Sequence, residues 1–169
     1  CVAAPTPHEK LLTRALGVGR KWMSVSTLAS AGSTISWAKE QLFGELSLAE
    51  FHRLIGRLVD QPPQPGITFQ PYLAGERTSI EQKTASLSGL TLGAKRQEIL
   101  WAILDGLARA SGERVPLLRA NHTRILPTVC ISGGLAGILH HILHRDWPRR
   151  WKHKRQEEMT LRGLGKLVD

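Results

Sequence analysis

The sequence predicts an α/β fold, because stretches with the alternation of β-strands and stretches with the period of α-helices follow one another along its 169 residues. In KWMSVSTL (21–28) and ITFQPYL (67–73), large apolar side chains alternate with small or polar ones, as in half-buried strands. After Lys95, apolar residues recur three and four positions apart, as on one face of a helix. The length fits one compact domain, in which we expect a mixed sheet flanked by helices.

The first helix is expected after the small-residue turn ASAGST (29–34), which follows the first strand. Ser33 or Thr34 can cap its N-terminus, and Gly44 can end it. Apolar residues recur at helical spacing between these limits, at Ile35, Ala38 and Leu42.

A second helix is expected to begin after Ser47, because Glu50 stands three residues later and completes a capping box. Its apolar face is predicted to contain Leu48, Phe51, Leu54, Ile55 and Leu58. The proline-rich segment QPPQPG (61–66) must end helical structure, because proline lacks the backbone N–H that a helix needs.

The middle of the chain predicts two extended segments and the longest helix. ITFQPYL (67–73) and ASLSGLTL (85–92) have strand-like patterns, and the turn GERT (75–78) lies between them. From Lys95 to about Ala110 the pattern predicts a helix. Its apolar face contains Ile99, Leu100, Ile103, Leu104 and Leu107.

The last third predicts a strand, a glycine turn and a helix in succession. ILPTVCI (125–131) is continuously apolar, as a buried strand is, and SGGLAG (132–137) leads from it into the helical ILHHILH (138–144). A final segment at 156–167 has helical character. No internal repeat is evident, so one α/β domain accounts for the whole chain.

The composition indicates what kind of protein this is and where in the cell we expect it. A hydrophobic content of 41% with 22% charged residues is typical of a globular protein, and no apolar run approaches the roughly 18 residues of a membrane span. No secretory signal is visible, so we expect a cytoplasmic protein without membrane contact. Cys130 lies in an apolar segment, where we expect a buried, reduced thiol. The chain begins with Cys1 rather than methionine, which indicates a processed chain or part of a longer one.

The net charge of +9 is compatible with an anionic partner. Much of the excess lies in RDWPRRWKHKR (145–155), where basic residues alternate with Trp147 and Trp151. This composition suits phosphate contacts and base stacking, so a non-enzymatic module that binds nucleic acid or another polyanion is one hypothesis. The alternative is a solvated loop and edge strand whose tryptophans pack inward. Composition alone favours that alternative, which makes nucleic acid an unexpected partner.

Two segments share one design, in which a strand, a glycine turn and a helix follow one another. They are TLASAGSTISW (27–37) and VCISGGLAGIL (129–139). A glycine lets a ligand approach the backbone closely, and the first N–H groups of a helix favour an anion. Ordinary turn chemistry explains either segment alone, and neither matches the known phosphate-loop or dinucleotide fingerprints.

Three histidines follow the second glycine turn, at His140, His141 and His144. His140 and His144 lie four residues apart, a spacing that can bind a metal ion. No further ligand pattern accompanies them, so we predict a packed or solvated helix face and no metal site. No motif for nucleophilic catalysis is present, and Ser132 fits the glycine turn.

Four segments resemble motifs of the FGGY carbohydrate kinases, in the same order. WMSVSTLASAGSTISWAKEQL (22–42) looks like their TLSAGGSLRW segment, and PYLAGERTS (71–79) with SLSGLTL (86–92) resembles their PYLSGERTP…GAFVGLT signature. VCISGGLAG (129–137) resembles their GGGA nucleotide motif, and LRGLGKL (161–167) is similar to their final helix. The resemblance covers nearly the whole chain and is strongest to pentulose and heptulose kinases, including xylulokinase-like proteins.

This resemblance implies an actin-like, ribonuclease-H-type ATPase lobe. Residues 1–169 would be the C-terminal domain, with the N-terminal lobe absent from this chain. The function implied is the nucleotide-binding part of an ATP-dependent kinase that phosphorylates a ketose or polyol hydroxyl, with ATP and Mg²⁺ as cofactors. The sugar would bind mainly through the absent lobe, and homo-oligomerisation is left open.

The resemblance also assigns residues. Gly32 and Ser36 would lie beside the adenosine, and Gly133, Gly134 and Leu135 would lie against the adenine and ribose. The turn residues Glu76 and Arg77 would support the cleft between lobes, or would form an ion pair that anchors a loop within the domain.

The chain departs from the family pattern in ways that bear on its activity. It has Leu135 and Ile138 where the family often has alanine and a polar residue, which puts one nucleotide hydrogen bond in doubt. The catalytic aspartate and the first phosphate turn of such kinases belong to the N-terminal lobe, and the second phosphate hairpin would lie before Cys1. No catalytic residue is therefore nominated, and the chain alone is expected to be inactive.

Overall fold

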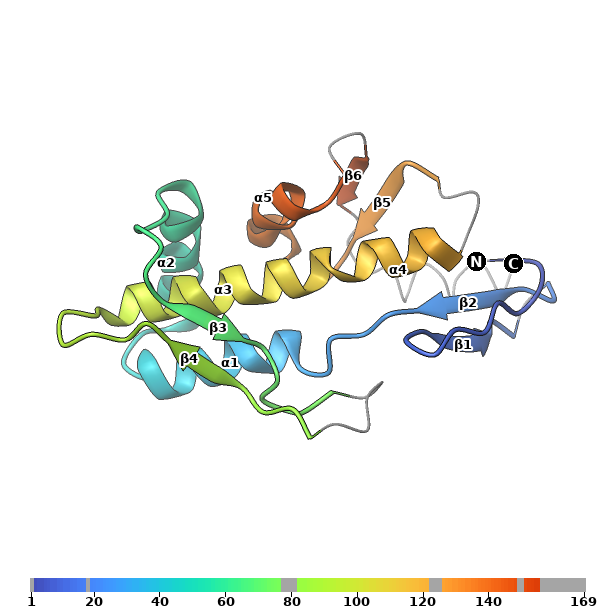
Figure 1. The fold of residues 1–169 in the computed structure, drawn as a ribbon. Helices are drawn as coiled ribbons and strands as arrows, with labels where there is room; N and C mark the ends of the chain where they lie inside the picture. The colour runs from blue at the N-terminus through green and yellow to red at the C-terminus, as the bar shows by residue number, and fades with distance from the viewer. Residues whose placement is uncertain (1, 18, 77–81, 122–125, 149–150, 156–169) are drawn as a thin grey trace.

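A long central helix, α3 (Arg96–Gly112), organises the molecule (Figure 1). The computed structural model describes residues 2–17, 19–76, 82–121, 126–148 and 151–155. The strand β3 and the helices α1, α2, α4 and α5 all contact α3. This helix confirms the most strongly periodic segment of the sequence. Its buried residues are Leu100, Ala102, Ile103, Leu104, Gly106, Leu107, Ala108 and Ala110.

Helix α1 (Ala31–Leu42) begins earlier than the sequence predicted. Its N-cap is Ser30, and Ser33 and Thr34 are helical, so the prediction that one of them caps the helix is wrong. The amide of Thr34 donates to the carbonyl oxygen of Ser30 over 2.8 Å, which closes the first helical turn around Gly32. The hydroxyls of Ser30 and Thr34 are buried 3.2 Å apart and hydrogen bond to each other, so neither reaches a backbone N–H as a cap would.

Helix α2 (Leu48–Asp60) confirms the predicted capping box. The amide of Ser47 donates to Glu50 Oε2 over 2.8 Å, and the amide of Glu50 donates to Ser47 Oγ over 3.3 Å. Four of the five predicted apolar-face residues are buried, namely Phe51, Leu54, Ile55 and Leu58. Leu48 is 63% exposed, contrary to the prediction, because it is the first helical residue and lies at the edge of the core.

The strands form three two-stranded sheets within the described residues, and not the one mixed sheet that was expected. β1 (Leu12–Ala15) and β2 (Trp22–Val25) are antiparallel, as are β3 (Thr68–Gln70) and β4 (Ser86–Ser88), whereas β5 (Thr128–Ile131) and β6 (Lys152–Arg155) are parallel. In register, Leu12 opposes Val25, Phe69 opposes Leu87 and Cys130 opposes Lys154. Each strand has only three or four residues and pairs with one other strand. The continuous core is formed mainly by the helices.

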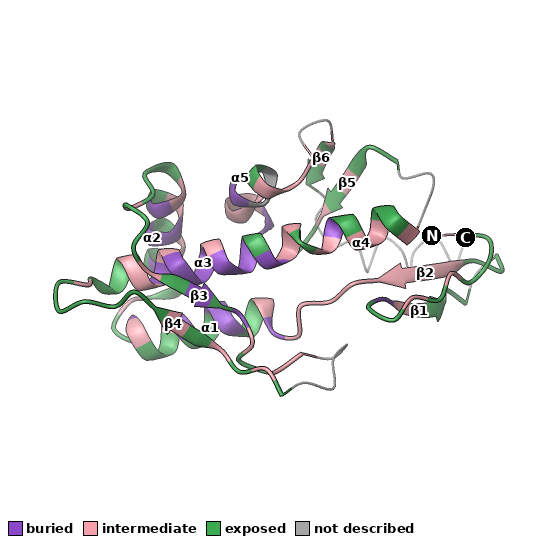
Figure 2. Cartoon of the chain, in the orientation of Figure 1, coloured by how far each residue is buried: buried purple, intermediate pink, exposed green. Residues whose placement is uncertain are grey.

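Close backbone packing seats β3 on α3. A Cβ added at Gly106 would overlap the carbonyl oxygen of Phe69, so only glycine permits this approach. Figure 2 shows the buried residues concentrated on α1, α2, α3 and β3, while the β1–β2 hairpin has none within its strands. The core therefore lies where the helices cross, at one end of the molecule.

Two elements were not predicted. The hairpin partner β1 is short and little buried, and α4 (Arg114–Asn121) contains Pro116. Proline is tolerated there because it falls in the first helical turn, where N–H groups have no intrahelical acceptor.

The strand β5 corrects a further prediction. Its residues alternate between exposed and half-buried, and Cys130 is exposed, whereas a buried strand and a buried thiol were expected. Successive side chains of a strand point to opposite faces, so the alternation shows that one face of β5 is half-buried and the other is exposed.

Helix α5 (Ala136–Asp146) follows β5 as predicted. The predicted helix at 156–167 and the LRGLGKL segment lie outside the described residues. Across the described ranges, no helix combines the length and the apolar character that crossing a membrane requires.

Candidate functional site

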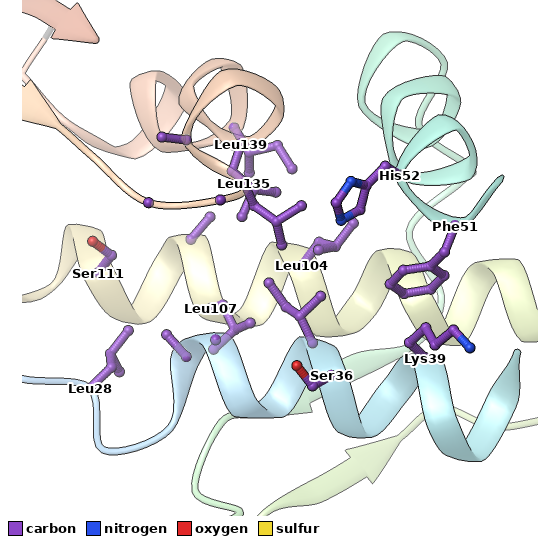
Figure 3. Close-up of a pocket in the computed structure, with 18 of the residues that line it drawn as sticks. Leu28, Ser36, Lys39, Phe51, His52, Leu104, Leu107, Ser111, Leu135 and Leu139 are labelled. Atoms are coloured by element: carbon purple, nitrogen blue, oxygen red, sulfur yellow. The ribbon is translucent and has the colours of Figure 1, made fainter. Parts of the chain in front are cut away.

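A cavity of about 760 Å³ lies between α1, α2, α3 and the turn that connects β5 to α5 (Figure 3). Its walls are mainly apolar. They include Leu28, Ile35, Leu104, Leu107, Leu135 and Leu139. A cavity of this size, with apolar walls and a few polar groups, is typical of a site for a small organic ligand.

Both glycine segments face this one cavity, but Gly32 lies in the first turn of α1 and not in a separate turn before the helix, as was predicted. Gly32 and Ser36 reach it from α1, and Gly133, Gly134 and Leu135 reach it from the β5–α5 turn. The structure thus brings together all five residues for which the sequence predicted nucleotide contact. Of the two positions that depart from the family pattern, Leu135 lines the cavity and Ile138 does not.

The glycines have different physical reasons for being glycine. Gly133 has a φ of 124°, a backbone conformation that other residues rarely adopt. Gly32 and Gly134 have no such angle, and a Cβ at either position would meet no heavy atom within 4 Å. At these two positions, the absence of a side chain leaves open space beside the cavity.

Two helices begin beside the cavity, and neither has a side-chain cap. Ser30, the N-cap of α1, and Leu135, the N-cap of α5, make no capping hydrogen bond through their side chains. The first-turn N–H groups and the helix dipole favour negative charge at such ends. This end of the cavity therefore suits the phosphates of a ligand.

Polar side chains also line the cavity, at Lys39, Glu40, His52, Ser111 and Ser132. Sequence reasoning did not identify His52, because a single histidine on an amphipathic helix carries no motif. Figure 3 shows its imidazole pointing from α2 into the cavity, toward Leu104 and Leu135.

The GERT turn is anchored within the domain. Gly75 has a φ of 69°, and Glu76 accepts ion pairs from Lys83 Nζ at 2.7 Å and from an Arg114 terminal nitrogen at 3.6 Å. Glu76 and Arg114 are only 15% and 14% exposed. Arg77 lies outside the described residues, so its predicted role stays a prediction.

Arg114 connects this turn to the surroundings of the cavity. Its guanidinium donates to the carbonyl oxygen of Thr27 over 3.1 Å and to that of Ala110 over 2.7 Å. Thr27 precedes the cavity residue Leu28, and Ala110 precedes the cavity residue Ser111. Glu76 therefore has a structural partner that joins three segments, while a role at an interface between lobes stays a prediction.

The histidines of α5 form contacts typical of a helix surface. The rings of His140 and His141 lie 3.7 Å apart, and His140 Nδ1 lies 2.9 Å from the carbonyl oxygen of Gly137. The side chain of His144 is outside the described part of the chain. Among the described residues, no three His, Cys, Asp or Glu side chains gather as they would around a metal ion.

The basic stretch at 145–155 places its tryptophans against each other. The rings of Trp147 and Trp151 meet edge to face at 6.1 Å, and both side chains are half-buried. Lys152, Lys154 and Arg155 are exposed on β6. This geometry favours the interpretation as a solvated edge strand, because rings packed together offer less surface for base stacking.

Carbohydrate kinases are among the known proteins that resemble this chain in sequence and in fold. No family model matches the chain. The chain is 25% identical over 107 residues to the xylulose kinase of Staphylococcus xylosus, in an alignment that covers 62% of this chain and 22% of that protein.

Two solved structures show the same fold. A protein described as a xyloylose kinase from Brucella ovis matches with a TM-score of 0.67 at 22% identity, over 84% of this chain and 30% of that one. The glycerol kinase of Plasmodium falciparum, solved with ADP, matches with a TM-score of 0.66 at 20% identity, over 94% of this chain and 32% of that one. These matches confirm the α/β, actin-like fold class. The chain spans only 22% of the length of the curated relative.

Proposed function

We propose, from the confirmed resemblance of this chain to the FGGY carbohydrate kinases, that residues 1–169 are the C-terminal, nucleotide-binding domain of an ATP-dependent sugar kinase. The complete enzyme would transfer the γ-phosphoryl group of ATP to a hydroxyl of a ketose or polyol. Because the chain spans 22% of the curated relative and 30% of a solved neighbour, the reaction of the whole enzyme is part of this proposal.

The observation that carries the proposal is the shared cavity of the two glycine turns. Its apolar walls suit a base and a ribose, and its two uncapped helix N-termini suit phosphates. The open space at Gly32 and Gly134 is the space that a Cβ would fill. The residues present therefore fit a nucleotide.

In this proposal the five residues have four roles. Gly32 and Gly134 admit the nucleotide close to the backbone, Gly133 provides the turn, and Leu135 packs against the base or ribose. The hydroxyl of Ser36 supplies a hydrogen bond, since it faces the same cavity from α1. Mg²⁺ would enter with the phosphates and would neutralise charge that develops during transfer.

The isolated chain is proposed to bind nucleotide without catalysing transfer. Phosphoryl transfer requires a base for the attacking hydroxyl and donors on both sides of the phosphates. The N-terminal lobe would supply the catalytic base and most contacts to the sugar. The cytoplasmic location and homo-oligomerisation stay predictions.

Nucleotide binding by the chain itself tests this function. We expect isothermal titration with ADP and with a non-hydrolysable ATP analogue to show saturable, one-to-one binding. We also expect ADP to raise the melting temperature, because a ligand that binds only the folded state stabilises it. If neither nucleotide binds at millimolar concentration, the proposed nucleotide domain is wrong. If ADP instead bound to a basic surface, oligonucleotides and inorganic polyphosphate would bind to the chain as well.

A further inference from the structure

The cavity has two chemically different ends. The glycine turns and helix N-termini lie at one end, and the first turn of α2 lies at the other, with Leu48, Phe51 and His52. Along α1, the lining residues run from Ala31 to Glu40. Nine steps along a helix correspond to about 14 Å. A nucleotide whose phosphates meet the helix N-termini and whose ribose and base pack against Leu135 would therefore extend toward α2.

At the α2 end of the cavity, the polar side chain that points into the cavity is His52. Its imidazole is half-buried and points toward Leu104 and Leu135, whereas the amino group of Lys39 extends along α1 toward the C-terminal end of that helix (Figure 3). Within the described part of the chain, His52 has no hydrogen bond or ion pair. His52 is also not among the described residues with a buried, unpartnered polar atom, so its ring nitrogens are accessible to a ligand in the cavity.

We propose that His52 recognises the base of the bound nucleotide and so determines base specificity, an inference that depends on the proposed nucleotide function. A neutral imidazole offers one hydrogen-bond donor and one acceptor. The two ring nitrogens point in different directions, so the ring can make one hydrogen bond to an adenine edge, either donating to a ring nitrogen or accepting from the amino group. The walls around His52, with Leu48, Phe51 and Leu104, suit the flat apolar faces of a purine.

Three variants of the full chain separate this role from general structural effects. His52→Ala removes the polar edge, and His52→Gln restores a donor and an acceptor on an uncharged side chain. His141→Ala is the matched control, because His141 is an exposed histidine of α5 that does not line the cavity. Each variant is titrated with ADP, with GDP and with inorganic triphosphate, which has no base.

We expect His52→Ala to weaken ADP binding about tenfold, as the loss of one hydrogen bond predicts. Triphosphate binding and the melting temperature of the free protein are expected to stay unchanged. His52→Gln should recover part of the ADP affinity, and His141→Ala should match the wild type. The preference for ADP over GDP should shrink only in His52→Ala.

The outcomes distinguish this inference from the function on which it depends. If the wild type binds ADP and His52→Ala binds it equally well with the same base preference, His52 does not recognise the base, and the nucleotide domain stands. If His52→Ala loses ADP and triphosphate binding to the same extent, its role is structural and the inference is wrong. If the wild type binds no nucleotide, the proposed function and this inference both fail.

Discussion

Gly133 and Gly134 are adjacent in the sequence but serve different physical purposes. Gly133 provides a backbone conformation with a φ of 124°, which a side chain would strain. Gly134 has no such constraint and faces open space at the cavity. A larger residue at Gly134 can therefore fill the site without disturbing the turn.

Gly134→Val is expected to weaken nucleotide binding about tenfold or more while leaving the melting temperature nearly unchanged, because its side chain would occupy ligand space. Gly66→Val is the matched control, since Gly66 is a loop glycine with equally open surroundings outside the cavity. Gly133→Ala should lower the melting temperature instead. Calorimetric titration and thermal unfolding measure both effects. If Gly134→Val lowered the melting temperature and left the nucleotide affinity unchanged, Gly134 would have only a structural role in the turn.

The capping box of α2 helps to position the residues that this helix contributes to the cavity. It defines where the helix begins, and the first turn then places Phe51 in the core and His52 toward the cavity. Hydrogen bonds from the Ser47 side chain, and then from its backbone, lower the pKa of Glu50 below its ordinary value of 4.5. Since the folded protein holds this carboxylate ionised, the cap contributes stability that depends on pH.

The stabilising effect of Glu50 should be fully present above about pH 4.5 and should be lost as the pH falls through its lower folded-state pKa. Glu50→Gln has no such titration. The difference in unfolding free energy between the wild type and Glu50→Gln should therefore shrink on acidification. Urea unfolding at about pH 7 and about pH 3.5 measures it. A difference that is constant across this range would contradict the assigned role of the carboxylate.

Across the whole molecule, the described segments converge on one cavity, which we propose holds the nucleotide. Both glycine turns belong to one helical core, and Arg114 joins the GERT turn to two segments beside the cavity. The chain matches 30% of the length of a solved kinase. The proposed function assigns the catalytic base to another lobe, so it predicts that nucleotide binding and catalysis separate in experiments on this chain.

The isolated chain is expected to release no ADP above background when it is supplied with ATP, Mg²⁺ and a panel of ketoses and polyols. The reason is that the base and half of the phosphate contacts belong to the proposed N-terminal lobe. A coupled assay for ADP measures this. Turnover near the roughly 1–100 per second of typical kinases would show that the chain contains its own catalytic groups.

The basic stretch at 145–155 is expected to bind single-stranded oligonucleotides no more tightly than micromolar at about 0.15 M salt, because its tryptophans pack against each other. Fluorescence titration at several salt concentrations measures this. Submicromolar affinity with a steep salt dependence, lost on replacing Trp147 and Trp151 with alanine, would instead support the nucleic-acid module.

Local patterns in the sequence were sufficient to predict the elements whose formation depends on near neighbours. The capping box of α2 and the apolar face of α3 are confirmed, because the interactions involved span only three or four residues. The motifs also identified the resemblance to carbohydrate kinases. Elements without a strong local signal, such as β1 and α4, were not predicted.

Only the tertiary structure decided which segments meet. It divided the strands into three pairs, left Cys130 exposed on β5, and brought Gly32 and Gly134 to one cavity. It also turned His52 inward, a placement that depends on how α2 packs against α5. These outcomes come from contacts between residues far apart in the chain, so the pattern of any one segment does not contain them.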